Sequence, residues 1–447
     1  MIAPEDQDTY TMACRHIPIR GMLALLVLTL GACIASPPVP SASPSLASPS
    51  PSPIEPGTSA RPSLEPSLSP SPAWPTPDAS LRLMFVTQED DGTAIVPTRP
   101  PVGFSYPDGT LIPAPAWAGG LLQAAGDFLA WSRDARYLAF DGYPMDENGW
   151  VEDPRGVTQI LLLISEPATG MLTTANPEGL HFSPLAGGPT WSPDSSRLAV
   201  PLLLSASMSR DSIYLVSPGG NPTRQITPPG AMFPSWSPLD SRLAYLDYTA
   251  SDSSCGPFFP DDRPGCDQAT LKVLDVDSGI ESTLLEGAHV SVETGGWGNV
   301  YNAPSWSPDG QWLIVFSGGR DPDLVAVDAD SGAQRRLARS VARGAYAAIA
   351  PDGGSVAYVS RATGNDEIML IPWAGGEEQN LTDDPSSDIS PVWSPDGRLL
   401  AFLSDRADRS RGGGYHLYTL DLLAGDVHQV SEAFVMTRPV WLPSPVH

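Results

Sequence analysis

Three histidines are the side chains of this sequence that could hold a catalytic metal ion. They are His181, His289 and His416, and neutral imidazole is a common ligand of zinc and related metals. The sequence has no Gly-x-Ser-x-Gly motif, no His-Glu-x-x-His motif and no glycine loop suited to a phosphate. We therefore expect no catalytic residues and no cofactor, and a metal site made of these histidines stands as the alternative.

Two cysteines, Cys255 and Cys266, are close enough in sequence to form a disulfide. Ten residues rich in proline and glycine separate them. Outside the cytoplasm such a pair is expected to be oxidised, and closing this loop would stabilise the fold by about 3 kcal/mol. A metal site at this pair is disfavoured, because no histidine lies nearby in the sequence.

The first 32 residues resemble a bacterial export signal. Arg15 and Arg20 precede the apolar residues 21–30, a run that is short for a membrane span. The run ends in Leu-Gly-Ala-Cys at residues 30–33, which resembles a lipobox. The resemblance implies that residues 1–32 are removed and that Cys33 carries a lipid. The lipid would anchor the chain to the outward face of the bacterial cell membrane, and the sequence does not indicate which leaflet holds it. An ordinary signal peptide is the alternative.

Residues 33–80 are predicted to be a disordered linker. They consist almost wholly of proline, serine and alanine, with repeated Ser-Pro units. Such a composition cannot build a core and favours extended polyproline conformations. The linker would hold a folded domain, residues 81–447, away from the membrane.

The charge of the chain argues against nucleic acid as a partner. The formal net charge is −26, and Lys272 is the single lysine among 25 basic residues. An excess of this sign repels phosphate backbones and anionic membrane surfaces. We therefore expect membrane contact only through the lipid anchor, and a monomer.

Residues 81–447 are built from a repeat whose clearest copy is 390–404, with Trp393 before the turn Ser-Pro-Asp-Gly. Proline suits the second position of such a turn and glycine the last. Other copies place Trp131, Trp191, Trp236 or Trp306 at the same position, and a degenerate copy places Ile349 there. Most copies are about 45 residues apart, which is typical of propeller repeats.

Each copy is expected to form four antiparallel strands. The residues after the turn are apolar on both faces, as in Leu-Leu-Ala-Phe at 399–402, which favours a sheet packed between two others. A third strand, a glycine turn and a polar fourth strand follow. These units resemble the TolB-type, WD-repeat-like β-propeller repeat, and the resemblance implies an all-β propeller. The copies with Ile349, with Arg133 in place of the turn proline and with Leu239 in place of the aspartate depart from it.

The ends of the repeat region predict how the ring closes. Residues 82–87 match a second strand that lacks its tryptophan strand, and residues 438–443 match a tryptophan strand that is followed by nothing similar. We expect the C-terminal strand to complete the N-terminal blade and hide both sheet edges. Seven first strands favour seven blades, and six remain possible because the strands of residues 88–128 are poorly defined.

Long insertions are predicted on one face of the propeller. They are residues 141–156, 176–188, 249–270, 287–303 and 406–414, whereas the opposite face has tight turns. Long loops on a rigid scaffold are common binding sites. The candidate contact residues on this face are Tyr143, Trp150, Phe258, Phe259, Trp297 and Tyr301, which alternatively pack under their own loops.

The function expected from these features is binding. A lipid-anchored, extracytoplasmic propeller would serve as a binding or scaffold module for a protein, a peptide or a cell-envelope glycan, without catalysis. The alternative is a metal-assisted polysaccharide lyase or hydrolase that uses His181, His289 and His416 on the same face. The identity of the ligand cannot be read from the sequence.

Overall fold

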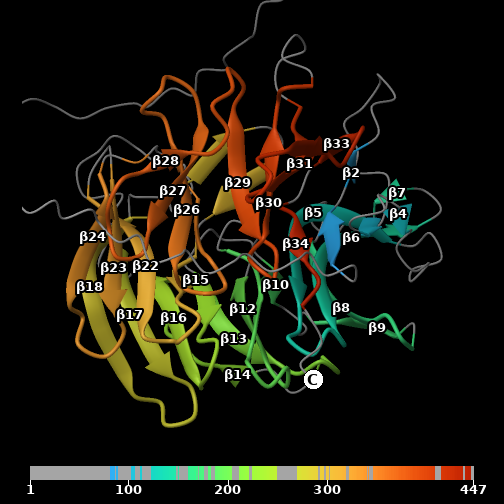
Figure 1. Cartoon of the computed structure of the whole chain (residues 1–447). Helices are drawn as coiled ribbons and strands as arrows, with labels where there is room; N and C mark the ends of the chain where they lie inside the picture. The colour runs from blue at the N-terminus through green and yellow to red at the C-terminus, as the bar shows by residue number, and fades with distance from the viewer. Residues whose placement is uncertain are drawn as a thin grey trace, which may run out of the picture. The chain divides into compact units, whose positions relative to one another are not determined.

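The computed structural model describes residues 81–443 with gaps, of which the longest are 89–101 and 249–268. The chain divides into two compact units, Met1–Ser69 and Pro70–His447, and every described residue lies in the second. All the regular elements described are β-strands, so no described helix could cross a membrane. The expected all-β class is confirmed. The antiparallel sheets follow one another around a common centre (Figure 1).

The first sheet combines strands from both ends of the described chain, and two sheets of consecutive strands follow it. One has the order β34 (Val440–Trp441), β1 (Arg82–Phe85), β3 (Val102–Ser105), β4 (Leu111–Ile112). The next has the order β5 (Leu122–Trp131), β6 (Leu138–Asp146), β8 (Leu161–Glu166), β9 (Met171–Thr174), with β7 (Gly149–Trp150) beside β6. A third has the order β10 (His181–Phe182), β12 (Leu198–Leu203), β13 (Ser212–Val216), β14 (Arg224–Gln225), with β11 (Thr190–Trp191) beside β12.

The middle of the chain forms two four-stranded units that are joined at one edge. Their strands are β15 (Ala231–Trp236), β16 (Arg242–Asp247), β17 (Ala269–Asp275), β18 (Glu281–His289), β22 (Trp312–Ser317), β23 (Asp323–Asp328), β24 (Gln334–Ala338), with β21 (Ser305–Trp306) beside β22. The join is a short pairing of β18 with β22 at Ala288↔Ser317 and His289↔Phe316.

Two regular four-stranded sheets and two small pairs complete the set. The sheets are β25 (Ala347–Ile349), β26 (Ser355–Ser360), β27 (Glu367–Pro372), β28 (Gln379–Asn380), and β29 (Asp388–Trp393), β30 (Leu399–Ser404), β31 (His416–Asp421), β32 (Val427–Gln429). The pairs are β2 (Thr87–Gln88) with β33 (Phe434–Val435), and β19 (Val292–Gly295) with β20 (Gly298–Tyr301). Every residue of β30 and β31 is buried, as expected for strands packed between neighbouring sheets.

The repeat turn is held by its own serine and aspartate. The Ser394 hydroxyl donates to Asp396 Oδ1 at 2.6 Å and accepts from the Leu399 backbone N–H at 2.9 Å. The Gly397 N–H donates to the Ser394 carbonyl at 2.8 Å, and Gly397 has φ +73°. Glycine is favoured there because a side chain would strain this left-handed conformation. The motif is therefore a self-contained turn whose polar groups are used locally.

The copy with Leu239 keeps the same turn length by another route. Its aspartate stands one residue later, and Asp240 Oδ1 accepts from the Arg242 N–H at 3.1 Å. That N–H occupies the position of the Leu399 N–H, which the Ser394 hydroxyl accepts in the regular copy. The carboxylate thus replaces the hydroxyl as the acceptor. The copy with Arg133 also keeps its turn, since the Ser132 hydroxyl donates to Asp134 Oδ1 at 2.6 Å.

Four of the repeat tryptophans connect their unit to the previous one, whereas the buried indole nitrogens of Trp131 and Trp236 have no hydrogen-bond partner among the described residues. The indole N–H of Trp191 donates to the Ala130 carbonyl at 3.0 Å, and that of Trp393 donates to the Ala348 carbonyl at 3.0 Å. Each acceptor directly precedes the corresponding position of the previous copy. The same bond joins Trp306 to Ser235 and Trp441 to Val392. The tryptophan is thus both a core side chain and an inter-sheet donor.

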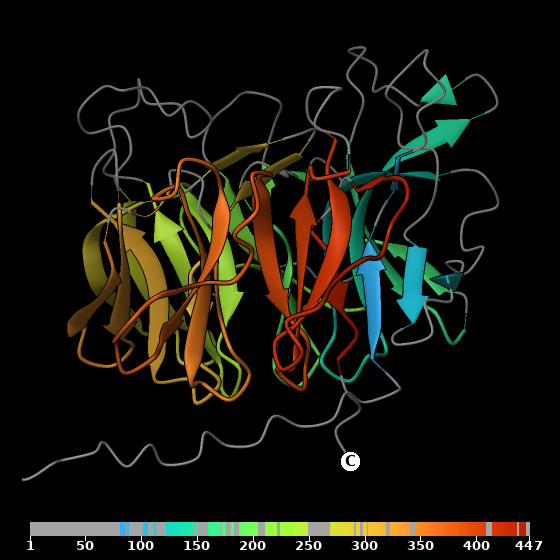
Figure 2. The same cartoon turned by 45° about the horizontal axis from the view of Figure 1, so that its top comes forward.

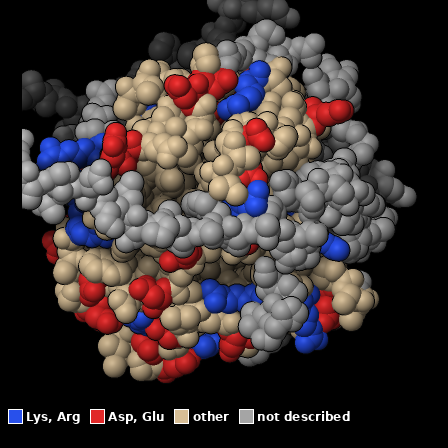
Figure 3. Space-filling view, viewed as in Figure 1, with Lys and Arg blue, Asp and Glu red and all other residues tan. Residues whose placement is uncertain are grey.

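Arginines add a second connection on the side of the repeat turns. Arg197 reaches the next sheet, where its guanidinium lies 5.3 Å from the Trp236 ring centre and 2.7 Å from Asp277. Arg242 repeats the arrangement one sheet further on, with Trp306 and Asp330. Acidic and basic side chains accordingly lie next to one another at many points of the surface in Figure 3. A net charge of −26 is thus compatible with close packing because many carboxylates are locally paired.

Candidate functional site

The strand directions place the longest connections on one side of the sheets. β16 leaves the repeat turn at Arg242 and ends at Asp247, which pairs with Thr270 of β17. The 248–268 connection is therefore at the end opposite to the repeat turn. In Figure 2 the tight hairpin turns gather along the lower side of the sheets. We call the opposite side the long-connection face.

Half of the predicted contact residues lie outside the described residues. These are Phe258, Phe259 and Trp297, together with the cysteines Cys33, Cys255 and Cys266. Only the backbone is described for Tyr143 in β6, Trp150 in β7 and Tyr301 in β20. Their role in binding stays a prediction.

Two of the expected loops contain a hairpin, and a third, residues 176–188, contains β10, which corrects the sequence interpretation. β6 continues to Asp146 and turns back into β7, with Met145 opposite Trp150. β19 and β20 form a hairpin in which Val292 pairs with Tyr301. Glycine and asparagine made both stretches resemble loops, but a hairpin needs only local backbone pairing and a short turn, which these residues favour.

The three histidines belong to three different strands. His181 is in β10, opposite Leu203, and His289 is the last residue of β18. Only the side chain of His416 is described. The residue is 6% exposed, its ring lies 5.0 Å from the Phe434 ring centre, and its buried Nδ1 has no hydrogen-bond partner among the described residues. Within the described part of the chain, no three or more histidine, cysteine or acidic side chains are grouped to hold a metal ion. The histidine site stays untested.

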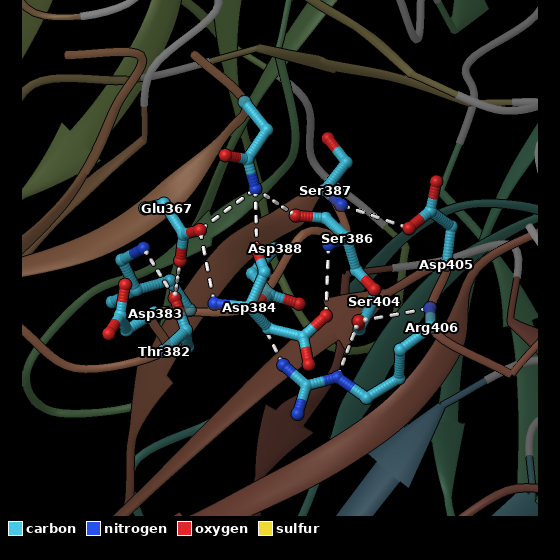
Figure 4. A network of polar contacts seen from close by, with 12 residues as sticks. Glu367, Thr382, Asp383, Asp384, Ser386, Ser387, Asp388, Ser404, Asp405 and Arg406 are labelled. Carbon is cyan, nitrogen blue, oxygen red and sulfur yellow. Dashed lines mark hydrogen bonds and ion pairs between the residues drawn. The ribbon is translucent and has the colours of Figure 1, made fainter. Parts of the chain in front are cut away.

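A buried ion pair organises the long-connection face between β29 and β31. Arg406 Nη2 lies 2.7 Å from Asp388 Oδ2, and its Nε donates to the Ser404 hydroxyl at 2.9 Å (Figure 4). The same guanidinium lies 5.3 Å from the Phe402 ring centre and 5.0 Å from that of Tyr418. The Asp388 side chain is fully buried. Arg406, at the start of a predicted long insertion, is therefore fixed to the sheet.

The environment of Asp388 disfavours its ionised form. Burial raises the pKa of this carboxyl to about 6, although the Ser404 hydroxyl and the Arg406 guanidinium lower it. The negative charge of Glu367 adds to the rise. Oδ1 of Asp388 is buried and has no hydrogen-bond partner among the described residues. The contacts with Arg406 and Ser404 thus only partly compensate for the burial of the Asp388 charge, and the strength of the ion pair depends on pH.

A second polar cluster lies beside this ion pair. Glu367 accepts hydrogen bonds from Asn365 Nδ2 at 2.8 Å and from the Asp384 N–H at 3.2 Å (Figure 4). Asn365 also donates to the backbone carbonyls of Asp384 and Ser386. The cluster ties the β26–β27 and β28–β29 connections together. This part of the long-connection face is therefore a rigid support.

Asp388, Ser404 and His416 lie side by side on three neighbouring strands, but their order does not match a hydrolytic triad. Asp388 pairs with Ser404, and Ser404 pairs with His416. In a triad the histidine lies between the serine and the aspartate. Here the serine is central and fully buried, and its hydroxyl accepts from Arg406. The row has a structural role.

A hollow of about 240 Å³ lies at the centre of the sheets, and the sequence interpretation missed it. Its wall comes from the one to three residues that precede the tryptophan position in six copies of the repeat. The lining residues are Phe128, Leu129, Gly188, Pro189, Thr190, Pro234, Ser235, Ala303, Pro304, Ser305, Tyr346, Arg438 and Val440. We call it the central hollow. The sequence did contain an indication of this site, because the residue types at these positions vary among the copies whereas those of the adjacent turns repeat.

Comparison with known proteins agrees with the geometry of the repeat. Residues 303–445 match the family model described as the TolB beta propeller domain. The chain contains a TolB-type β-propeller. Over 126 residues it is 34% identical to the Tol-Pal system protein TolB of Anaeromyxobacter dehalogenans, a match that covers 28% of this chain and 26% of that protein. Over 155 residues it is 30% identical to an uncharacterised protein of Agrobacterium fabrum, covering 32% and 53%.

A solved structure shares the fold of this TolB-type propeller. It is a puromycin-hydrolysing peptidase of Mycobacterium tuberculosis, with a TM-score of 0.50 and 15% identity over 81% of this chain and 56% of that chain. At this identity the likeness concerns the fold alone. The matched region spans about half of the Agrobacterium fabrum relative and about a quarter of TolB. The activities of these whole proteins are therefore not transferred.

Proposed function

We propose that this chain is a non-catalytic binding or scaffold module outside the cytoplasm, which holds a protein, peptide or cell-envelope glycan on its long-connection face. The observation that carries this proposal is the difference in connection length between the two faces. The repeat turns are short and use their polar groups internally, whereas the longest connections emerge opposite, next to the support formed by Asp388, Arg406 and Glu367. Variable segments on a rigid scaffold suit recognition.

The proposed ring has seven blades. β34 pairs with β1 at Leu83↔Trp441 and Met84↔Val440, which supports closure between the two ends of the repeat region. The two joined units in the middle count as two blades, because each contains its own repeat tryptophan, Trp236 or Trp306. Closure would leave neither end strand with an open edge.

The proposed attachment to the membrane is tested by changing Cys33 to Ser. Because only the thiol can accept the lipid, the variant should move from the membrane fraction to the soluble fraction, while the wild-type chain stays with the membrane. Mass spectrometry of the N-terminal peptide gives the second measurement. Equal sedimentation of both proteins, with no lipid on the wild-type peptide, would favour the ordinary signal peptide.

The proposed binding face is tested by replacing residues 250–267 with a short Gly-Ser linker, which leaves β16 and β17 intact. Capture of partners from envelope extracts should fall at least tenfold relative to the wild-type chain, because the longest connection is lost. A matched control replaces the exposed turn residues 423–425, on the opposite face. Equal capture by the wild-type chain and the 250–267 variant would count against this face, and loss of capture in EDTA alone would favour the metal-dependent alternative.

A further inference from the structure

The central hollow meets a second hollow on the side of the repeat turns. The second hollow measures about 430 Å³, and its lining residues are Arg133, Ser235, Trp236, Pro238, Trp306, Pro308 and Pro351. Ser235 lines both hollows, so the two lie at successive depths near the same axis. Pro238, Pro308 and Pro351 are turn prolines of three copies. Arg133 holds the same turn position in its own copy, which explains why that departure from the repeat puts a cation here.

The charge along this axis is opposite to that of the whole chain. Among the described residues that line either hollow, the charged ones are Arg438 and Arg133, and none is acidic. The chain as a whole carries a formal charge of −26. A cleft lined by charges of one sign concentrates their field. The axis therefore favours an anion in a molecule whose surface otherwise disfavours one.

Arg438 is positioned for planar recognition. Its guanidinium carbon lies 3.6 Å from the ring centre of Tyr346, so one face of the guanidinium is covered by the aromatic ring. A stacked guanidinium keeps its N–H groups at its edges, where they match the two oxygens of a carboxylate. Thr190, Ser235 and Ser305 add hydroxyl groups to the same wall.

The rest of the wall suits a small apolar body. Phe128, Pro189, Pro234 and Pro304 line the central hollow and present carbon surface. Ligand sites in proteins combine such apolar walls with a few convergent polar groups. A volume of about 240 Å³ limits the ligand to a small molecule or to the last residue or two of a chain.

We propose that the central hollow binds a carboxylate with a small apolar body, with Arg438 pairing with the carboxylate and the proline and aromatic wall holding the body. The carboxylate comes either from a free organic acid or from the C-terminus of a peptide. This proposal does not depend on the macromolecular partner proposed above.

The test is calorimetric titration of the full chain with three probes: phenylacetate, N-acetylphenylalanine and N-acetylphenylalaninamide. At least one acid should bind with a Kd below about 1 mM, and the amide, which lacks the negative charge, should bind at least tenfold more weakly. If phenylacetate binds more tightly, the source is a free organic acid. Tighter binding of N-acetylphenylalanine indicates a peptide C-terminus.

Variants assign the binding to Arg438. The R438Q substitution should weaken binding of the acids at least tenfold, because the positive charge of the guanidinium is lost. R335Q is the matched control: Arg335 also lies over aromatic rings, those of Trp312 and Trp373, but it does not line the hollow. S305L is a second variant for the case that R438Q does not fold. It narrows the hollow and keeps the charge, and it should also weaken binding of the acids at least tenfold. Absence of binding, equal binding of acid and amide, or binding unchanged in the folded variants would overturn the proposal.

Discussion

Replacing Arg406 with Met should lower the free energy of unfolding by about 3 kcal/mol at pH 7.5. The substitution keeps the aliphatic stem but leaves the fully buried Asp388 carboxylate without its cation, and breaking a buried pair from one side costs a few kcal/mol. The measurement is urea denaturation followed by tryptophan fluorescence. R336M is the control, because the Arg336–Asp323 pair is more exposed and should contribute less than about 1 kcal/mol.

The loss in R406M should depend on pH in a defined direction. The pKa of Asp388 is already raised from 3.8 to about 6 in the folded protein, so folding favours the protonated acid and this group's contribution to stability falls as the pH rises from about 4 to 6. Without Arg406 the folded-state pKa rises further, and the decline extends to higher pH. R406M should therefore lose less stability at pH 5 than at pH 7.5.

A double variant separates charge from packing. D388N/R406M removes the carboxylate that R406M leaves unpaired, so most of the stability lost in R406M should return at pH 7.5. A loss that is the same at every pH, or that the Asp388→Asn change does not reduce, would show that Arg406 acts through its packing on Phe402 and Tyr418 instead.

Replacing Trp441 with Ala should cost about 4 kcal/mol of unfolding free energy. Trp441 is 7% exposed and belongs to the large core cluster that also contains Leu83 and Leu399. Truncating a buried tryptophan removes apolar contact and leaves a cavity. Its indole N–H also donates to the Val392 carbonyl at 3.1 Å. The effect should be large although the residue is only a few positions from the chain end.

Hydrogen exchange can show whether Trp441 acts through ring closure. Because β34 pairs with β1, W441A should increase exchange in residues 82–85 before it affects β26 or β30. W373A is the control, since Trp373 is only partly buried and lies in a turn after β27, where truncation should cost less. If residues 82–85 exchange as in the wild-type chain, the pairing of β34 with β1 is not what closes the ring.

The turns of the repeat were the most predictable features, because local chemistry specifies them. Ser394, Asp396 and Gly397 each satisfy a requirement of one turn. The Leu239 copy shows the limit of such reasoning: it lacks the aspartate at the usual position, but Asp240, one residue later, accepts the backbone N–H that the serine hydroxyl accepts in the regular copy. Counting residue types at fixed positions missed a replacement that the backbone geometry allows.

The polar support of the long-connection face could not be predicted in the same way. Asp388 and Arg406 are 18 residues apart and belong to different strand ends, and no local pattern indicates that one is fully buried. The central hollow is likewise built by residues that meet only when the sheets surround a common centre. Such sites depend on long-range packing, whereas sequence patterns report mainly on the local period of strands and turns.

The indole hydrogen bonds have a consequence for how such chains evolve. A copy such as 390–404 supplies both a donor, the indole N–H of Trp393, and an acceptor for the copy that follows, the Val392 carbonyl. An in-frame duplication or deletion of one copy therefore brings a ready donor against a ready acceptor, and no new interface has to arise. The number of units can thus change by recombination at such junctions without loss of this hydrogen bond, whereas the junction at Trp236, whose buried indole nitrogen has no partner among the described residues, does not depend on it.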